Sequence, residues 1–429
     1  MRGAGTASYV MGLLSGLLLA LIVLELWPTT PDLDHYRQVR DFAREAFVRE
    51  VTDEELLDHA LHGMLAGLDP YSRYYDREES RDLDRETRGR FRGIGVVFRS
   101  PVAAGQVLYP LPGSPAHRAG VRVGDTFVSI DGRAVASLGE PELRTLLADP
   151  SHDRLEVRLR DLDGAERDVV IVPQSIVDPS VRRVRMLDHA RGVGYLVVSS
   201  FSKETNAELD EAIEFLMRRG MQALILDLRH NLGGVLEAAL GVAGRFVREG
   251  TILSTEGRGD PVIYRATPES AWYAGLPLVV LVDGDTASAS EVLAVALQDH
   301  RAAVLVGEPT FGKGTVQTIR SFDRQGTSAK VTSSYYYSPT HRNLERTVDE
   351  GRAWGIQPDV HVPLTETERA RVHQRLADYG PGPEAIPALE AWEEREGVVL
   401  IEPMPSDPQL KAALGLLVGQ RPGPVPIER

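Results

Sequence analysis

An uncharged apolar run stands at the N-terminus of the chain. It extends from Tyr9 to Leu24, with Arg2 before it and Asp32 and Asp34 after it. About 18 apolar residues are close to the minimum that crosses a bilayer, and positive charge stays on the cytoplasmic side. Because no small-residue cleavage site follows, residues 1–30 are predicted to form an uncleaved, single-pass anchor in the cytoplasmic membrane rather than a removed signal peptide. The rest of the chain is then expected to be periplasmic or otherwise extracytoplasmic.

Residues 31–89 show the spacing of amphipathic helices. Thr52 and Glu55 have the spacing of a capping box. After them, apolar residues recur at positions that share one helix face. This face consists of Leu57, Ala60, Leu61, Met64, Leu65 and Leu68. The pattern predicts a helical region whose second helix ends near Pro70.

The pattern changes to short alternating segments between residues 90 and 174. Segments such as 126–130 (TFVSI) and 155–161 (LEVRLRD) alternate apolar and polar residues, and glycine turns separate them. Such alternation is typical of strands with one buried face. We therefore expect a small β-rich domain over 90–174, with one helix near 140–147.

From residue 175 to 365 the chain alternates strand and helix patterns. Continuous apolar runs at 193–198, 223–228, 277–283 and 302–307 are separated by amphipathic segments. Runs without polar alternation are typical of strands covered on both faces. The repeated units predict an α/β layered core with a mostly parallel sheet, followed by a helical tail over 366–429.

Composition narrows the possible functions. A chain of 429 residues is long enough for two or three domains. Its net charge of −14 disfavours nucleic acid as a partner. With no cysteine, thiol catalysis and disulfides are excluded, and the 11 histidines show no HExxH-type spacing. No metal or other cofactor is predicted.

Three short segments of the core carry candidate chemistry, and each has an ordinary structural explanation. In residues 226–234 (LDLRHNLGG), adjacent glycines can aim backbone N–H groups at a ligand, although a tight βα turn explains them as well. In 283–291 (DGDTASASE), Ser288 could be a nucleophile or a helix cap. In 310–317 (TFGKGTVQ), Lys313 could be a surface lysine or a base. As a base it needs a pKa lowered by about 3 units, which burial near an apolar wall such as Phe311 could provide.

Taken together, these segments resemble the carboxyl-terminal processing (tail-specific) serine protease family. The resemblance extends over about residues 35–365 and includes GMLAGLDPYSRYY (63–75), FRGIGVVF (91–98) and GIQPDVHV (355–362). It implies a crotonase/Clp-like core that hydrolyses peptide bonds near protein C-termini. By the resemblance, Ser288 is the nucleophile and Lys313 its base.

The resemblance also assigns supporting roles. Gln317 would orient Lys313, and the backbone N–H groups of Ala289 and of Gly233 or Gly234 would form the oxyanion hole. Asp299 matches an acidic position that supports the structure. Ser290 is a rival nucleophile, but it points to another helix face.

The β-rich segment resembles a PDZ domain. Its FRGIG sequence would form a loop, Gly93, Ile94, Gly95 and Val96, whose N–H groups bind the free C-terminus of a peptide. A small β-barrel without a ligand is the alternative. Protein or peptide substrates with a free C-terminus are therefore the expected partners, with an adaptor protein and a homo-oligomer as further possibilities.

Two departures from the family pattern bear on function. Leu232 stands where the family has proline, and residues 338–359 are less regular than the matching family segment. A catalytically silent PDZ scaffold on the same fold is the main alternative function. Since both Ser288 and Lys313 are present, the sequence favours the enzyme. An enoyl-CoA-type enzyme would need neither this pair nor the PDZ segment.

Overall fold

The computed structural model describes residues 31–87, 89–149, 153–346, 355–377, 380–400 and 407–419. The membrane anchor expected over residues 1–30 lies outside these ranges. Within the described ranges, no helix combines the length and the apolar character needed to span a membrane.

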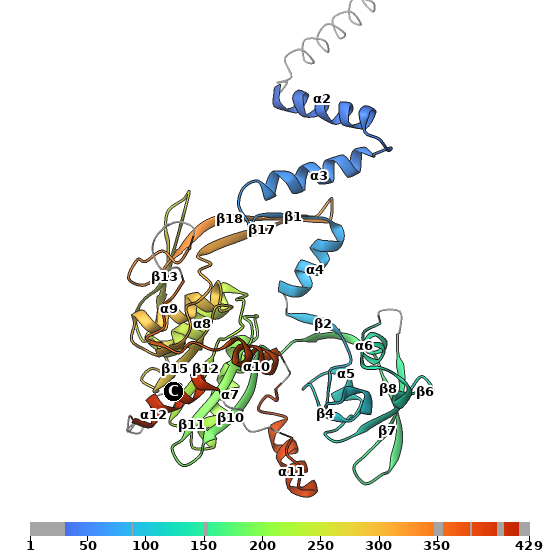
Figure 1. Ribbon diagram of the computed structural model, residues 1–429, viewed down its shortest axis with the longest axis vertical. Helices are drawn as coiled ribbons and strands as arrows, with labels where there is room; N and C mark the ends of the chain where they lie inside the picture. Colours follow the sequence, from blue (N-terminus) through green and yellow to red (C-terminus); the bar gives the residue numbers. More distant parts are fainter. Residues whose placement is uncertain are drawn as a thin grey trace, which may run out of the picture.

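Two N-terminal helices, α2 (Pro31–Ala46) and α3 (Asp53–Ala66), project from the rest of the molecule (Figure 1). Half of the expected capping box forms, because Thr52 Oγ1 accepts a hydrogen bond from the Glu55 N–H at 3.1 Å. The Glu55 carboxylate pairs with Arg49 instead of closing the box. Of the apolar face of α3, Leu65 is buried, whereas Met64 is 59% exposed. The helical period is therefore as predicted, but the described residues leave much of this face exposed.

The β-rich module has its own small core. A four-stranded antiparallel sheet in the order β6-β5-β7-β8 is joined by two strand pairs, β2-β9 and β3-β4. Side chains of β7 alternate between buried and exposed, as the sequence pattern predicted. The elements are β2 (Arg90–Gly93), β3 (Val96–Phe98), β4 (Val107–Pro110), α5 (Pro115–Arg118), β5 (Thr126–Ile130), β6 (Arg133–Ala134), α6 (Glu140–Ala148), β7 (Leu155–Arg160), β8 (Glu166–Ile171) and β9 (Gln174–Val177).

A six-stranded sheet forms the centre of the larger body, in the order β10-β11-β12-β15-β16-β19. Its first strand is antiparallel to β11 and the other pairs are parallel, which agrees with the predicted mostly parallel sheet. The strands are β10 (Val181–Asp188), β11 (Val193–Val198), β12 (Ala223–Asp227), β15 (Leu278–Val282), β16 (Val304–Gly307) and β19 (Val360–His361).

Helices cover both faces of this sheet. Leu224 and Leu226 of β12 pack into the cluster that contains α7 (Thr205–Arg218), α8 (Leu236–Phe246) and α9 (Ala289–Asp299). Ile225, which points the other way, packs against α10 (Glu366–Ala377) and α12 (Pro408–Gly419). The C-terminal tail is thus part of the layered core. Its remaining helix, α11 (Ile386–Glu396), packs through Leu389 and Trp392 on the β-rich module.

A second sheet lies beside the core and brings distant segments together. Its order is β1-β18-β13-β14, with β17 paired to β18. Because β1 pairs with β18, the N-terminal region reaches the hairpin that follows Lys313. The elements are β1 (Arg73–Tyr75), α4 (Arg77–Thr87), β13 (Gly250–Gly257), β14 (Val262–Ala266), β17 (Thr315–Phe322) and β18 (Thr327–Tyr337).

Candidate active site

The turn between β12 and α8 requires its two glycines. Gly233 and Gly234 have φ values of 106° and 139°, which favour glycine. A Cβ on Gly233 would lie 2.9 Å from Ser288 Cβ, and one on Gly234 would lie 2.1 Å from the Phe201 carbonyl oxygen. The glycines therefore allow this turn to lie directly against Ser288.

Ser288 occupies a strained position immediately before α9. Its φ of 58° and ψ of −119° are outside the regions that non-glycine residues normally adopt. Strain of this kind persists only where the surrounding structure enforces it, and it is concentrated at functional sites. Its backbone N–H donates to Glu291 Oε2 at 2.9 Å, which fixes the turn from within the helix that follows.

Hydrogen bonds join the Ser288 turn to the glycine turn. The Ala287 N–H and the Ser290 hydroxyl both donate to the Asn231 carbonyl oxygen at 3.0 Å. Ser290 is fully buried, so its hydroxyl has a structural partner and no access to solvent. This arrangement favours Ser288 over Ser290 as the nucleophile.

The backbone donors near Ser288 are not equivalent. The Gly233 N–H donates to the Asn231 side-chain oxygen at 2.9 Å, so it is already used within the turn. Within the described ranges, the N–H groups of Ala289 and Gly234 have no hydrogen-bond partner. Of the two glycines between which the sequence did not decide, the geometry favours Gly234.

One buried carboxylate connects the Ser288 turn to the Lys313 loop. Oε2 of Glu291 accepts hydrogen bonds from the N–H groups of Ser288 and Lys313, at 2.9 and 2.8 Å. Its Oε1 accepts from the Thr310 hydroxyl at 2.5 Å and from the Gly312 N–H at 2.7 Å. Burial raises the pKa of Glu291, and these hydrogen bonds act in the opposite direction. The motifs around Ser288 and Lys313 are thus held on a single side chain that sequence reasoning had not singled out.

The Lys313 side chain lies in a partly buried environment assembled from distant segments. Burial lowers its pKa, repulsion by Lys330 lowers it further, and Glu345 and Glu291 act in the opposite direction. Its Nζ lies 4.9 Å from the centre of the Tyr71 ring. The aromatic neighbour of Lys313 is therefore Tyr71 and not Phe311, whose ring instead contacts Arg346.

Tyr71 is held in place by Asp69. The Asp69 carboxylate accepts a hydrogen bond from the Tyr71 N–H at 2.8 Å and another from the Thr332 hydroxyl of β18 at 3.1 Å. Tyr71 belongs to the GMLAGLDPYSRYY segment of the resemblance, but its contact with Lys313 depends on the pairing of β1 with β18. No local pattern could have revealed it.

The side chains of Ser288 and Lys313 have different partners in this structure. Ser288 interacts with the phenol of Tyr336, whose pKa burial raises to about 12. Within the described ranges, no hydrogen bond joins the side chains of Ser288 and Lys313. Gln317 donates to the Thr315 hydroxyl at 2.8 Å, and within the described ranges no hydrogen bond joins it to Lys313, so its orienting role stays a prediction.

Two further residues support the structure around the site. Asp299, at the end of α9, accepts hydrogen bonds from the N–H and hydroxyl of Thr340, in keeping with the supporting role expected for it.

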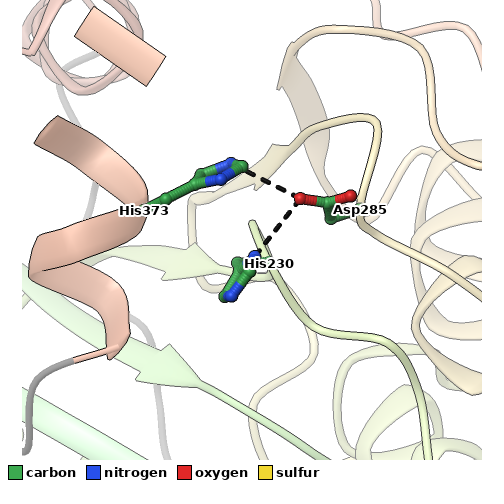
Figure 2. A group of neighbouring side chains, drawn as sticks. All are labelled: His230, Asp285 and His373. Carbon is green, nitrogen blue, oxygen red and sulfur yellow. Dashed lines mark hydrogen bonds and ion pairs between the residues drawn. The ribbon is translucent and has the colours of Figure 1, made fainter. Parts of the chain in front are cut away.

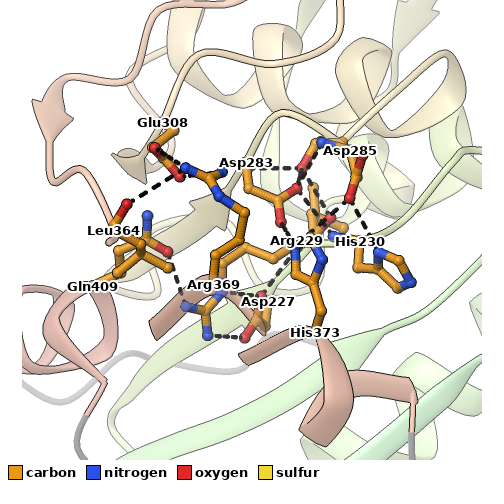
Figure 3. A network of polar contacts seen from close by, with 12 residues as sticks. Asp227, Arg229, His230, Asp283, Asp285, Glu308, Leu364, Arg369, His373 and Gln409 are labelled. Atoms are coloured by element: carbon orange, nitrogen blue, oxygen red, sulfur yellow. Dashed lines mark hydrogen bonds and ion pairs between the residues drawn. The ribbon is translucent and has the colours of Figure 1, made fainter. Parts of the chain in front are cut away.

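Arg229 is fully buried and pairs with Asp227 at the end of β12 and with Asp407 beside α12. Burial would raise the pKa of Asp407, but Arg229 holds it at about 2. Figure 3 shows the Asp227–Arg229 contact at the sheet edge from which the glycine turn leaves.

The loop Gly93–Val96 lines a cavity of about 910 Å³ between the β-rich module and the core. Gly95 has a φ of 75°, and a Cβ there would lie 2.3 Å from Ser114 Cβ. Glycine is thus required at this position by its left-handed backbone and by packing within the module. Ile94 is buried, and its carbonyl accepts a hydrogen bond from the Ala116 N–H.

Comparison with known proteins identifies the family. Residues 192–362 match the model "Peptidase family S41", residues 106–161 match "PDZ domain", and residues 27–79 match "Activating protease CtpB N-terminal domain". The carboxy-terminal-processing protease of Bartonella bacilliformis is 31% identical over 362 residues, covering 81% of this chain and 80% of that protein. The chain belongs to the carboxy-terminal-processing proteases.

A second relative supports this assignment, and a solved structure is similar in sequence. The carboxyl-terminal-processing protease of Synechocystis sp. is 33% identical over 330 residues, which is 75% of each chain. A solved photosystem II D1 C-terminal processing protease is 30% identical and covers 75% of this chain and 85% of its own, with a TM-score of 0.43. The protein is accordingly a serine peptidase of the C-terminal processing type, with an α/β core and an inserted PDZ domain.

Proposed function

We propose that this peptidase cleaves substrates near their C-termini with Ser288 as nucleophile and Lys313 as general base. The observation that carries the proposal is the Glu291 carboxylate oxygen that accepts N–H hydrogen bonds from both residues. The strained backbone of Ser288 and the lowered pKa of Lys313 support the same assignment.

The reaction then has two stages. Neutral Lys313 takes the Ser288 proton while the serine oxygen attacks the scissile carbonyl, and the ammonium returns that proton to the leaving amine. The N–H groups of Ala289 and Gly234 stabilise the oxyanion. Water then attacks the acyl-enzyme, with Lys313 again as base. Because no hydrogen bond joins the two side chains within the described ranges, a change of side-chain conformation precedes the first stage.

We further propose that the PDZ loop Gly93–Val96 selects polypeptides with a free C-terminus. Backbone N–H groups of such a loop recognise a terminal carboxylate, and the peptide adds as a strand. Residues 1–30 would anchor the protein, with its peptidase part on the outer side of the cytoplasmic membrane. An adaptor and a homo-oligomeric state remain compatible with this arrangement.

The decisive experiment measures cleavage of an unstructured substrate by Ser288→Ala and Ser290→Ala variants. We expect Ser288→Ala to be inactive yet folded, and Ser290→Ala to keep activity, since its hydroxyl only bonds the Asn231 carbonyl. Near-normal turnover by Ser288→Ala together with loss in Ser290→Ala would overturn the assignment.

The PDZ role is tested separately, by binding of one peptide with a free or an amidated C-terminus to Ser288→Ala. Equal affinities would exclude carboxylate recognition without affecting the dyad.

A further inference from the structure

Two histidines and an aspartate converge beside the turns of the active site (Figure 2). His230 belongs to the β12–α8 turn, Asp285 to the β15–α9 turn, and His373 to α10. One ligand atom from each lies within 4.8 Å of the other two. The three residues are far apart in sequence, and none of them has a role in the proposed reaction.

The spacing of these atoms suits a divalent transition metal. His230 Nδ1 lies 3.2 Å from Asp285 Oδ2, and His373 Nε2 lies 3.6 Å from the same oxygen. Tetrahedral Zn²⁺ with bonds of about 2.0–2.1 Å separates neighbouring ligand atoms by roughly 3.3 Å. The separation of the two histidine nitrogens, which is at most 4.8 Å, would have to shorten by at most about 1.5 Å for both to bind one ion.

A fourth ligand atom is available from Asp283. Its Oδ2 lies 3.2 Å from His373 Nε2, while its Oδ1 accepts the N–H groups of His230 and Asp285. Asp283 is nearly fully buried and so has a fixed position. His373 Nε2 thus faces two carboxylates at once, whereas one hydrogen bond from this nitrogen can satisfy only one of them.

The local charge also favours a cation. Asp283 and Asp285 place two carboxylates beside the two imidazoles. The neighbouring arginine of α10, Arg369, makes a bidentate pair with Glu308, at 2.9 Å for both contacts. Figure 3 shows this pair next to the cluster. Arg229, which also acts on Asp283, is likewise paired with Asp227 and Asp407. A dication would therefore neutralise a site whose neighbouring arginines are already paired with other carboxylates.

We propose that His230, Asp285 and His373, with Asp283 as fourth ligand, form a binding site for Zn²⁺ or a similar divalent transition metal ion. Two imidazoles and carboxylate oxygens are a ligand set that Zn²⁺ accepts. His230 stands three residues before Gly233 in the glycine turn, and Asp285 belongs to the Ser288 turn. An ion bound to both and to His373 would therefore tie the two turns to α10. It would act as a structural clamp on the active site, and the proposal does not depend on the Ser288/Lys313 mechanism.

The test uses the full chain carrying Ser288→Ala, which prevents self-cleavage, after chelator treatment. Calorimetric titration with Zn²⁺ should give one equivalent bound, and Co²⁺ should give the visible absorption of a site with histidine ligands. His230→Gln and His373→Gln should each weaken Zn²⁺ binding at least about tenfold, since even second-shell changes cost that much. Zn²⁺ at 100 times its Kd should raise the Tm by on the order of 5 °C, and only when both histidines are present.

A matched control is His62→Gln. His62 contacts two carboxylates, at 3.2 Å from Asp58 and 3.5 Å from Glu79, but within the described ranges it belongs to no group of three candidate metal ligands. This variant should bind Zn²⁺ as the parent does. His230 is exposed, so its replacement should leave the fold intact even if His373→Gln does not. Absence of stoichiometric binding by the parent, or undiminished binding by His230→Gln, would overturn the proposal.

Discussion

The Ser288 turn and the Lys313 side chain are positioned in different ways. The hydrogen bonds that fix Ser288 and Ala287 come from two short motifs, through Asn231 in the glycine turn and Glu291 in the helix that follows. The environment of the Lys313 amine comes from Tyr71, Lys330 and Glu345, which lie far apart in sequence. The nucleophile is thus built by local backbone geometry, whereas the properties of the base depend on tertiary packing.

Substitutions in these two regions should therefore impair catalysis in two different ways. Damage to the local motifs should misplace atoms and reduce the rate at every pH. Damage to the surroundings of Lys313 should leave the atoms in place and move the pH at which the base becomes neutral.

The largest effect is expected from Lys313→Arg. Arginine keeps the positive charge but cannot lose its proton in the working pH range. If Lys313 is the base, Lys313→Arg should be as inactive as Lys313→Ala, with losses of about 10³-fold or more in kcat/KM. Substantial cleavage by folded Lys313→Arg protein would rule out the dyad, because a lysine needed only for its charge would tolerate arginine.

A smaller loss is expected from Glu291→Gln. The carboxylate of Glu291 accepts four hydrogen bonds, and an amide would place an NH₂ group against two of those donors. Misplacing the two loops should lower kcat by about 10²-fold across the pH range, and each unsatisfied donor should reduce the free energy of unfolding by about 1–3 kcal/mol.

Glu368→Gln is a matched control for this change. Glu368 also accepts the N–H of the residue three positions earlier, Thr365, at the start of a helix, but it is only partly buried, whereas Glu291 is fully buried. Its replacement should leave both activity and stability nearly unchanged. Equal effects of the two substitutions, measured by peptide cleavage and thermal unfolding, would argue against Glu291 as the link between the loops.

The same distinction explains what the sequence could and could not predict. The α/β core and the β-rich module could be predicted because the spacing of apolar residues and the glycine turns are local signals. The continuous apolar run 223–228, for example, forms a strand that is buried on both faces. Because Glu291 follows Ser288 by three residues, its capping position could be predicted from the sequence. Its hydrogen bonds to the Lys313 loop could not. Tyr71 was hidden because only the pairing of β1 with β18 brings it to Lys313.

Some differences arise from tertiary packing rather than from misread local patterns. The apolar face of α3 has the predicted period, yet Leu57 and Leu68 remain 49% and 60% exposed, because α3 stands away from the core. The tail from residue 366 was predicted only to be helical, and α10 and α12 in fact cover one face of the central sheet. The helical spacing of apolar residues predicts that a helix has an apolar face, but it does not predict which segment covers that face.

The smallest effect should come from the surroundings of the base, and its sign is the informative part. The Tyr71 ring stabilises the ammonium form of Lys313 through a cation–π contact of about 0.5–2 kcal/mol. Its removal in Tyr71→Leu should therefore lower the lysine pKa, by about 0.4–1.5 units. Lys330 repels the ammonium form, so Lys330→Gln should raise that pKa. Activity depends on neutral Lys313 and rises with pH, so the acid limb of kcat/KM should move to lower pH in Tyr71→Leu and to higher pH in Lys330→Gln. Tyr71→Phe, which keeps the ring, should leave the profile in place. If the acid limb of kcat/KM moved in the same direction in Tyr71→Leu and Lys330→Gln, or did not move in either, the group titrating in the profile would not be Lys313.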